Sequence, residues 1–186
     1  MSDQATGPLT EGFERSPGED GTLGSGTRVG RLVVLGPIGE GGMGRVYSAF
    51  DSMLDRRVCL KFLKSRGVDS ADDAGNQRLL EEARALAHVS HPGILPIFDV
   101  GEFEGRVYLV TEFVDGWTLA DWVRVREPAP DAIVAALRRA GEGLAAAHAA
   151  SIVHRDFKPD NVMMGRDGRV RVMDFGLALR GESGSD

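Results

Sequence analysis

The chain has 186 residues and 42% hydrophobic residues, which is enough apolar material for a buried core, and its length predicts one domain. Its formal net charge is −6 and its pI is about 5.3, a balance that argues against nucleic acid or an anionic membrane surface as a partner. The single cysteine, Cys59, excludes an internal disulfide and favours a cytoplasmic protein. No apolar run approaches the ~20 residues of a membrane span, so we expect no membrane segment in this chain.

The first part of the chain, residues 1–27, is predicted to be a disordered leader. It is rich in Gly, Ser, Thr and Pro, and it contains five acidic residues against one arginine, which gives it a charge of −4. Scattered apolar residues in such a segment cannot offset the entropy lost on ordering. Folded structure is therefore expected to begin near Arg28.

Five short apolar runs follow, and each is predicted to be a β-strand. They are rich in Val, Ile, Phe and Tyr and are separated by Gly, Asp and Pro, which is the pattern of strands and their turns. The runs are residues 31–38, 46–50, 58–63, 94–100 and 106–113.

A helix is predicted over residues 74–89, between the third and fourth strands. Leu79, Ala83 and Leu86 recur there at spacings of three and four, and Pro92 follows the end of the pattern. These residues define the face that we expect to be buried.

A second helix is predicted over residues 131–150, after Pro130. Asp131 is the expected N-cap, and Ile133, Leu137 and Leu144 mark the apolar face of this alanine-rich segment.

Two smaller elements complete the prediction. A short helix is expected around residues 119–125, and residues 162–164 and 170–173 are expected to form a hairpin across the turn at residues 165–168.

The segment Gly39-Glu40-Gly41-Gly42-Met43-Gly44 matches the pattern G-x-G-x-x-G. Glycines at this spacing let backbone N–H groups approach phosphate oxygens. In dinucleotide-binding proteins the same pattern opens a helix, whereas residues 45–50 continue as a strand here, which suits a loop that folds over a nucleotide. Taken alone, the glycine cluster would favour an ordinary hairpin turn, and the motifs that follow reverse that preference.

Lys61 lies inside the otherwise apolar third strand, on the same side as Cys59 because side chains alternate along a strand. One explanation is a lysine that extends along apolar surface to solvent. The other is a partner on the following helix, where Glu82 lies at the edge of the apolar face and Glu81 lies opposite it. We predict that Glu82 pairs with Lys61 and that Glu81 is a solvated surface charge.

The most informative stretch is His154-Arg155-Asp156-Phe157-Lys158-Pro159-Asp160-Asn161, followed by Asp174-Phe175-Gly176. Phosphoryl transfer from ATP needs a carboxylate for the hydroxyl proton, oxygen ligands for Mg²⁺ and a cation beside the transferring phosphate. Asp156 supplies the first of these, Asn161 with Asp174 the second, and Lys158 the third.

These motifs together resemble the signature set of protein kinases over residues 28–180. Lys158, two residues after Asp156, is similar to serine/threonine kinases, and the glycine loop with His91-Pro92-Gly93-Ile94 resembles the bacterial branch of eukaryotic-type kinases. The resemblance implies an α+β protein-kinase-like fold. Its N-lobe, residues 28–113, would be a five-stranded antiparallel sheet with one helix, and residues 114–186 would form the hinge and part of a helical C-lobe.

The resemblance also implies ATP and Mg²⁺ as cofactors and the residues that bind them. Lys61, Glu82 and backbone groups of Glu112 and Val114 would contact the nucleotide, with Thr111 just behind the adenine. The loop over the phosphates would consist of Ile38, Gly39, Glu40, Gly41, Gly42, Met43, Gly44, Arg45 and Val46. The implied partner is a protein with Ser or Thr hydroxyls, and the sequence leaves the oligomeric state open.

Two features depart from the family pattern. Cys59 replaces the usual alanine over the expected adenine site, where it could crowd the base or be an inert buried thiol. The chain also ends at Asp186, before an Ala-Pro-Glu motif, so we expect an incomplete C-lobe. The predicted function is transfer of the ATP γ-phosphate to Ser or Thr hydroxyls. The alternatives are an inactive, truncated nucleotide-binding or interaction module and a gene fragment.

Overall fold

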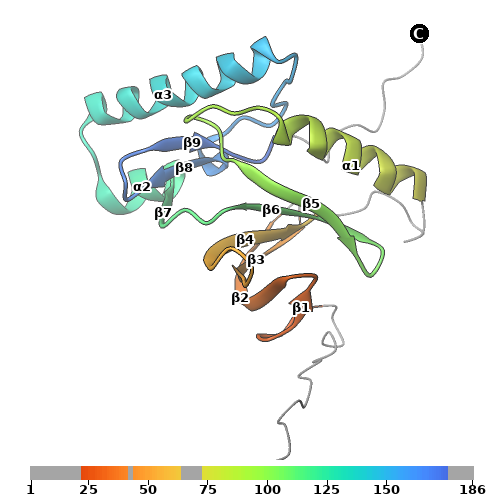
Figure 1. Cartoon of the computed structure of the whole chain (residues 1–186). Coiled ribbons are helices and arrows are strands. Elements are labelled where there is room, and N and C mark those ends of the chain that lie inside the picture. The colour runs from red at the N-terminus through yellow and green to blue at the C-terminus, as the bar shows by residue number, and fades with distance from the viewer. Residues whose placement is uncertain (1–21, 42–43, 64–72, 176–186) are drawn as a thin grey trace, which may run out of the picture.

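The structure is a computed structural model of the chain, and it describes residues 22–41, 44–63 and 73–175. Figure 1 shows two parts, one above the other. The lower part is an antiparallel sheet with one helix, α1, beside it, and the upper part contains helices α2 and α3 with a small second sheet. This is the two-lobed arrangement that the sequence predicts.

The larger sheet has six strands in the order β1-β2-β3-β4-β6-β5, and all its neighbours are antiparallel. The five predicted strands are confirmed, but the predicted total of five is wrong, because a two-residue strand pairs with β2 at the edge. The strands are β1 (Arg28–Val29), β2 (Leu32–Gly41), β3 (Gly44–Asp51), β4 (Arg56–Phe62), β5 (Ile97–Phe103) and β6 (Arg106–Glu112).

The fourth predicted strand begins three residues later than expected, at Ile97. Ile94 instead forms a parallel bridge with Val172, and the Leu95 N–H donates to the Val172 carbonyl at 2.9 Å. Pro96 has no N–H to offer a ladder. The segment before β5 therefore belongs to the contact between the two lobes.

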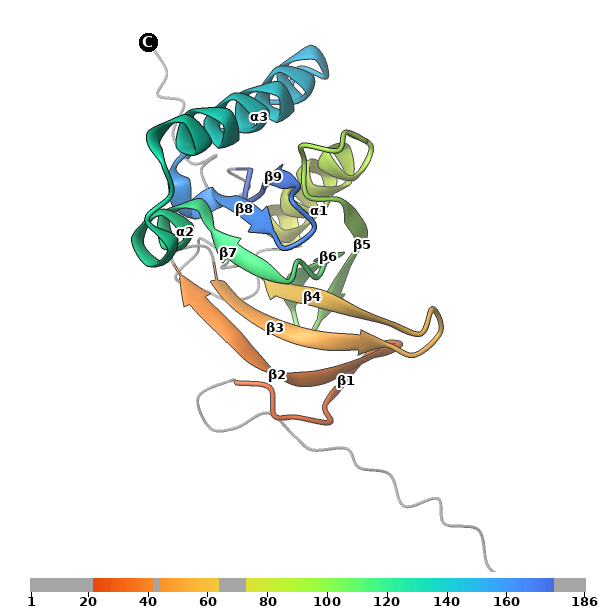
Figure 2. The same ribbon diagram turned by 90° about the vertical axis from the view of Figure 1, so that its left-hand side faces the viewer.

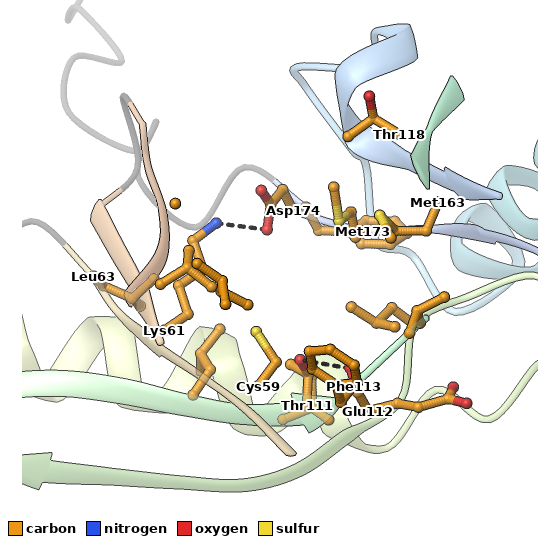
Figure 3. A pocket seen from close by; sticks show the side chains of 18 of the residues that line it. Cys59, Lys61, Leu63, Thr111, Glu112, Phe113, Thr118, Met163, Met173 and Asp174 are labelled. Carbon is orange, nitrogen blue, oxygen red and sulfur yellow. Dashed lines mark hydrogen bonds and ion pairs between the residues drawn. The ribbon is translucent and has the colours of Figure 1, made fainter. Parts of the chain in front are cut away.

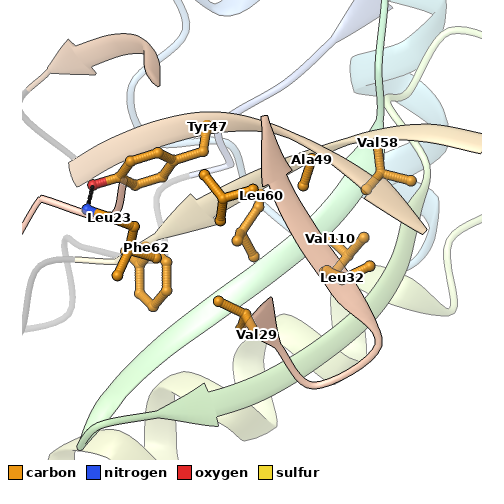
Figure 4. Close-up of a cluster of buried hydrophobic side chains, with 10 residues drawn as sticks. Leu23, Val29, Leu32, Tyr47, Ala49, Val58, Leu60, Phe62 and Val110 are labelled. Carbon is orange, nitrogen blue, oxygen red and sulfur yellow. Dashed lines mark hydrogen bonds between the residues drawn. The ribbon is translucent and has the colours of Figure 1, made fainter. Parts of the chain in front are cut away.

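A cluster of buried apolar side chains fills the space within the six-stranded sheet (Figure 4). Leu23 is fully buried in it, and the Leu23 N–H donates to the Tyr47 hydroxyl at 3.2 Å. The prediction that residues 1–27 form a leader is therefore wrong at its end. Leu23 is a single large apolar residue among polar ones, and only the folded sheet reveals the space that it fills.

Helix α1 (Asp73–Ala87) packs beside β5 and β6. Ala83 and Leu86 are buried and Leu79 is half-buried, so the predicted apolar face is confirmed. Glu81 is exposed and accepts a hydrogen bond from Gln77 at 3.2 Å, as expected of a surface charge.

The upper part is built on a three-stranded sheet in the order β7-β8-β9, with helix α3 lying against β9 (Figure 2). Its elements are β7 (Gly116–Thr118), α2 (Leu119–Arg126), α3 (Pro130–Ala149), the 3-10 turn η1 (Pro159–Asn161), β8 (Val162–Gly165) and β9 (Val170–Val172). The predicted short helix and hairpin are both present. Within the described ranges, no helix is both long and apolar enough to cross a membrane.

The predicted apolar face of α3 is partly confirmed, because Leu144 is half-buried against the core, but the fully buried residues of the helix are small ones. Its buried residues are Ala136, Ala140, Gly143 and Ala147, whereas Leu137 is 42% exposed. Small residues are needed because the backbones approach closely, and a Cβ on Gly143 would lie 2.3 Å from the Gly93 carbonyl oxygen.

The beginning of α3 also differs from the prediction. Ala129 is the N-cap residue and makes no side-chain capping bond, and Pro130 occupies the first turn. Proline at this position has a suitable φ and loses no helical hydrogen bond. Asp131 therefore lies inside the first turn, where its charge favours the positive end of the helix dipole.

Candidate active site

A cavity of about 420 Å³ lies between the two parts of the molecule. Figure 3 shows Cys59, Lys61 and Thr111 on one side of it, and Met163, Met173 and Asp174 on the other. Eight of the residues that we predicted to bind the nucleotide or its metal line this cavity: Ile38, Gly39, Glu40, Val46, Lys61, Glu112, Val114 and Asp174.

The glycine-rich segment forms the tip of the hairpin between β2 and β3, where Gly41 pairs with Gly44. Gly44 has a φ of +135°, and a Cβ there would lie 1.8 Å from the Phe62 carbonyl oxygen, so only glycine fits. Gly42 and Met43 lie outside the described residues.

Arg45 does not line the cavity. Its guanidinium lies 3.4 Å from Glu40 and donates to the Thr22 hydroxyl at 2.5 Å. The arginine therefore fastens the hairpin, close to its tip, to the segment before β1.

Lys61 is buried on β4, and its Nζ contacts the Asp174 Oδ1 at 2.5 Å. This pair joins the two sides of the cavity (Figure 3). A lysine that extends to solvent is thereby excluded. Glu82 lies on α1, but its side chain is outside the described residues, so its pairing with Lys61 stays a prediction.

The segment after β6 connects the two lobes and forms one wall of the cavity. The Glu112 N–H donates to the Pro96 carbonyl at 3.2 Å, and the Thr111 hydroxyl donates to the Glu112 carbonyl at 3.4 Å. The first bond occupies the Glu112 N–H, which leaves the carbonyl as the backbone group of Glu112 that can face a ligand.

Cys59 stands beside Thr111 in the sheet register and lines the cavity. Burial raises the pKa of its thiol, so the thiol is protonated at neutral pH and is a poor nucleophile. The bulk of the Cys59 side chain narrows the cavity at this point.

No metal-binding cluster of three or more His, Cys, Asp or Glu side chains occurs among the residues with described positions.

The sequence predictions did not select several apolar residues that line the rest of the cavity. These residues line the cavity because the fold places their strands and helix next to the gap between the lobes, and no local motif marks them. These residues are Leu63, Leu86, Leu95, Ile97, Leu109, Phe113, Met163, Met173 and Phe175, together with Thr118.

The loop at His154–Asn161 is anchored through its buried histidine. A ring nitrogen of His154, Nε2, lies 2.9 Å from the Met173 carbonyl oxygen, and the ring packs at 4.6 Å from the Phe175 ring. The Asp156 N–H donates to the other ring nitrogen at 3.3 Å. His154 thus ties the loop to the segment that ends in Asp174.

Asp156, Lys158 and Asn161 contact one another beside the cavity rather than in its lining. Lys158 Nζ lies 2.9 Å from Asp156 Oδ2, and the Asn161 amide donates to the Asp156 carbonyl at 2.7 Å and to Oδ2 at 3.2 Å. The hydrogen bond from Lys158 lowers the pKa of Asp156, and the same bond raises the pKa of Lys158. Asp156 is therefore an ionised carboxylate at neutral pH.

A backbone hydrogen bond joins the segments that contain the predicted metal ligands, Asn161 and Asp174. The N–H of Met173, the residue before Asp174, donates to the Asn161 carbonyl at 2.9 Å. The Asn161 amide nitrogen is occupied by Asp156, so the amide oxygen is the atom that can bind a cation. An amide oxygen and one carboxylate, completed by phosphate oxygens, are a donor set that suits Mg²⁺.

Comparison with known proteins decides the family. Residues 32–186 match the family model of the protein kinase domain. The chain belongs to the protein kinase family. Membership of this family implies ATP and a divalent cation as cofactors.

Relatives of this kinase domain are named as bacterial serine/threonine-protein kinases. The chain is 42% identical over 150 residues to the probable kinase PknB of Lactococcus lactis, covering 80% of this chain and 24% of the relative. It is 39% identical over 170 residues to PknL of Mycobacterium tuberculosis, covering 91% of this chain and 41% of the relative. The chain thus spans about a quarter to two fifths of the length of these relatives.

Solved kinase structures show the same fold. The kinase domain of M. tuberculosis PknI superposes with a TM-score of 0.73 at 30% identity, over 85% of this chain and 63% of that structure. The prediction of a bacterial eukaryotic-type kinase fold with part of its C-lobe is confirmed.

Proposed function

We propose that this domain transfers the γ-phosphate of ATP to Ser or Thr hydroxyls of protein substrates. The observation that supports this most strongly is the ion pair between Lys61 and Asp174 across the cavity. It brings a cation for phosphate oxygens and a carboxylate for a metal to the same point. The nearby contact of Asp156 with Lys158 and Asn161 adds the groups for the transfer itself.

The nucleotide would enter with its base between the hinge and the two methionines. The Glu112 carbonyl and the Val114 backbone would bind the adenine edge, and apolar side chains such as Met163 and Met173 would cover its faces. The hairpin around Gly41 and Gly44 would lie over the phosphates, with Lys61 beside them.

Asn161 and Asp174 would bind Mg²⁺, which neutralises charge on the phosphates during transfer. Asp156 would accept the hydrogen bond of the substrate hydroxyl and orient its oxygen toward the γ-phosphorus. It can do so because its lowered pKa leaves it ionised. Lys158 would contribute positive charge next to the same oxygen and hold the Asp156 side chain in place.

The inactive-module alternative is not favoured. An inactive descendant would have no need to retain the three mutually bonded groups Asp156, Lys158 and Asn161. The cytoplasmic location, which the single free cysteine suggests, forms part of the same proposal.

The test is phosphoryl transfer by a version of the domain that has a complete kinase C-lobe. Incubated with γ-labelled ATP, Mg²⁺ and a generic protein substrate, it should label serine or threonine, as read by mass spectrometry, and the label should disappear in Asp156→Asn. The exposed and unrelated Asp131→Asn serves as control. Label confined to tyrosine, or label that persists in Asp156→Asn, would contradict the proposal.

A further inference from the structure

The strand β9 contains a buried cation that the phosphoryl-transfer chemistry does not use. Arg171 has a side chain only 4% exposed and lies between two buried valines. Its guanidinium contacts Glu112 through Nε at 2.9 Å and Nη2 at 3.0 Å, and Asp167 through Nη2 at 2.8 Å and Nη1 at 3.3 Å. Two carboxylates therefore hold one arginine in a planar fork.

The surroundings of Arg171 are shaped for this arrangement. A Cβ on Gly165 would lie 2.2 Å from Asp167 Oδ1 and 3.1 Å from Arg171 Nη1, so the hairpin leaves room for the two side chains. The hydrogen bond from Arg171 also lowers the pKa of Asp167 to about 2. Burying a cation costs free energy unless carboxylates with good geometry compensate its lost hydration. The two carboxylates therefore hold the Arg171 guanidinium in one position.

The two partners lie on different parts of the molecule. Asp167 belongs to the turn of the hairpin that contains Arg171 itself. Glu112 ends β6 and begins the connection between the lobes, and it is one of the residues that line the cavity. The Arg171–Glu112 contact therefore spans the two lobes, whereas the Arg171–Asp167 contact stays within one.

The position of Arg171 along the chain links it to the other wall of the cavity. Three residues later the same strand segment reaches Asp174, and Met173 between them lines the cavity. The neighbouring Val172 N–H donates to the Gly93 carbonyl at 2.8 Å, which fixes this strand on its other side. The position of Glu112 is therefore connected, through Arg171 and β9, to the positions of Met173 and Asp174, which we propose hold the base and the metal.

We infer that Arg171 is a positioning residue for nucleotide binding. By binding the Glu112 carboxylate, it fixes the position of the Glu112 backbone carbonyl relative to Met173 and Asp174. The inference rests on the proposed nucleotide site. Arg171 does not touch the ligand, and it acts through Glu112 on one wall and through β9 on the other.

The experiment is calorimetric titration of Mg²⁺-ATP into the 186-residue chain, with thermal melting measured in parallel. Glu112→Gln preserves the shape and backbone of the hinge but removes the charge across the lobes, and Arg171→Met removes the cation. Both should weaken ATP affinity about 3- to 30-fold. Arg171→Lys should fall between Arg171→Met and the wild type, because an ammonium cannot serve both carboxylates with a planar fork.

Two variants on the same hairpin separate positioning from mere stability. Asp167→Asn removes the contact within the hairpin, and Arg166→Met removes an exposed arginine whose partners are Asp115 and the Trp117 ring. Each should change ATP affinity less than about twofold, even where the melting temperature falls. The double variant Glu112→Gln/Arg171→Met should bind no more weakly than Arg171→Met alone, because both single changes break one contact.

Equal ATP affinity in wild type and Glu112→Gln would overturn the inference, and so would equal losses in Glu112→Gln and Asp167→Asn. If Arg171→Met does not fold, Glu112→Gln and Arg171→Lys decide by the same criterion. A folded wild-type chain that binds no Mg²⁺-ATP would overturn the proposed function and this inference together.

Discussion

The two sides of the cavity are supported in different ways. On the sheet side, Lys61 lies between Leu60 and Phe62 in the strand, and both of these side chains belong to the buried apolar core of the sheet. On the other side, Asp156 and Lys158 lie on a loop fixed by one histidine and one asparagine. The comparison indicates that nucleotide binding depends on strands with a complete core, whereas the chemistry depends on a few polar contacts.

Helix α3, which precedes the loop at His154–Asn161 in the chain, shows the same contrast. The inner face of α3 is packed through small residues, but Val134 is 64% exposed on its outer face, and Val153, just before the loop, is also exposed. Cover over the loop side is therefore incomplete in the described structure. We expect perturbations of the two sides to have separable effects.

The largest expected effect comes from Asp156→Asn on the loop side. In a version with a complete C-lobe, loss of this proposed base should lower kcat by ~10²- to 10⁴-fold. ATP affinity should hardly change, because Asp156 does not line the cavity. The measurement pairs steady-state kinetics with calorimetry, and near-normal turnover would remove Asp156 from the mechanism.

Gly44→Ala should be the most damaging small change on the sheet side. A methyl group there would collide with the Phe62 carbonyl in a backbone conformation that suits only glycine. We expect a loss of more than ~2 kcal/mol in the free energy of unfolding. The matched control is Gly141→Ala at an exposed position of helix α3, where an added Cβ would meet no atom within 4 Å apart from the adjacent helix backbone. This variant should stabilise the chain by ~0.5 to 1 kcal/mol. Similar losses in both variants would contradict this account.

The exposed apolar face of α3 should be detectable in the 186-residue chain. We expect this chain to bind a hydrophobic dye and to phosphorylate a generic protein no faster than background. The double variant Val134→Gln/Leu137→Gln should reduce the dye signal, because these two side chains lie one turn apart on the helix.

Met53→Gln provides the comparison for this experiment, since Met53 is an exposed apolar residue in a turn of the sheet lobe. It should leave the dye signal almost unchanged. A cooperatively melting chain with no dye binding and strong Asp156-dependent activity would defeat the prediction.

The smallest expected effect concerns the pH dependence of Asp167. Its folded-state pKa is about 2, below the ordinary value of 3.8, chiefly through the hydrogen bond from Arg171. The group therefore stabilises the fold above pH ~4, and this contribution disappears as the pH falls from ~4 to ~2. The difference in melting temperature between wild type and Asp167→Asn should shrink over that interval. A difference that is independent of pH would show that ionised Asp167 contributes nothing.

Much of this site could be predicted because its chemistry is concentrated in short motifs. The polar residues from His154 to Asn161 and at Asp174 stand out against apolar neighbours. The glycine pattern is weak evidence by itself, and only together with these residues does it predict a phosphate loop. Five of the six strands were predictable because each is a short apolar run bounded by turn residues, whereas β1 was missed and the start of β5 was misplaced by three residues.

Other features could not be read from local sequence. The buried face of α3 was predicted from its large residues, but a close approach to Gly93 selects alanine and glycine instead. Leu23 was assigned to a polar leader because only the folded sheet provides the space that buries it. Arg171 looks like a surface charge in a strand, and only the fold brings it to Glu112, 59 residues away.

The most direct test of the separation between the two sides is a titration of Mg²⁺-ATP into the 186-residue chain and three variants. The account predicts binding by wild type, similar binding by Asp156→Asn and by the surface control Arg124→Met, and at least ~10-fold weaker binding by Lys61→Met, which loses the buried cation beside the phosphates. Equal affinity in the wild type and Lys61→Met, or a loss of binding in Asp156→Asn as large as in Lys61→Met, would contradict it.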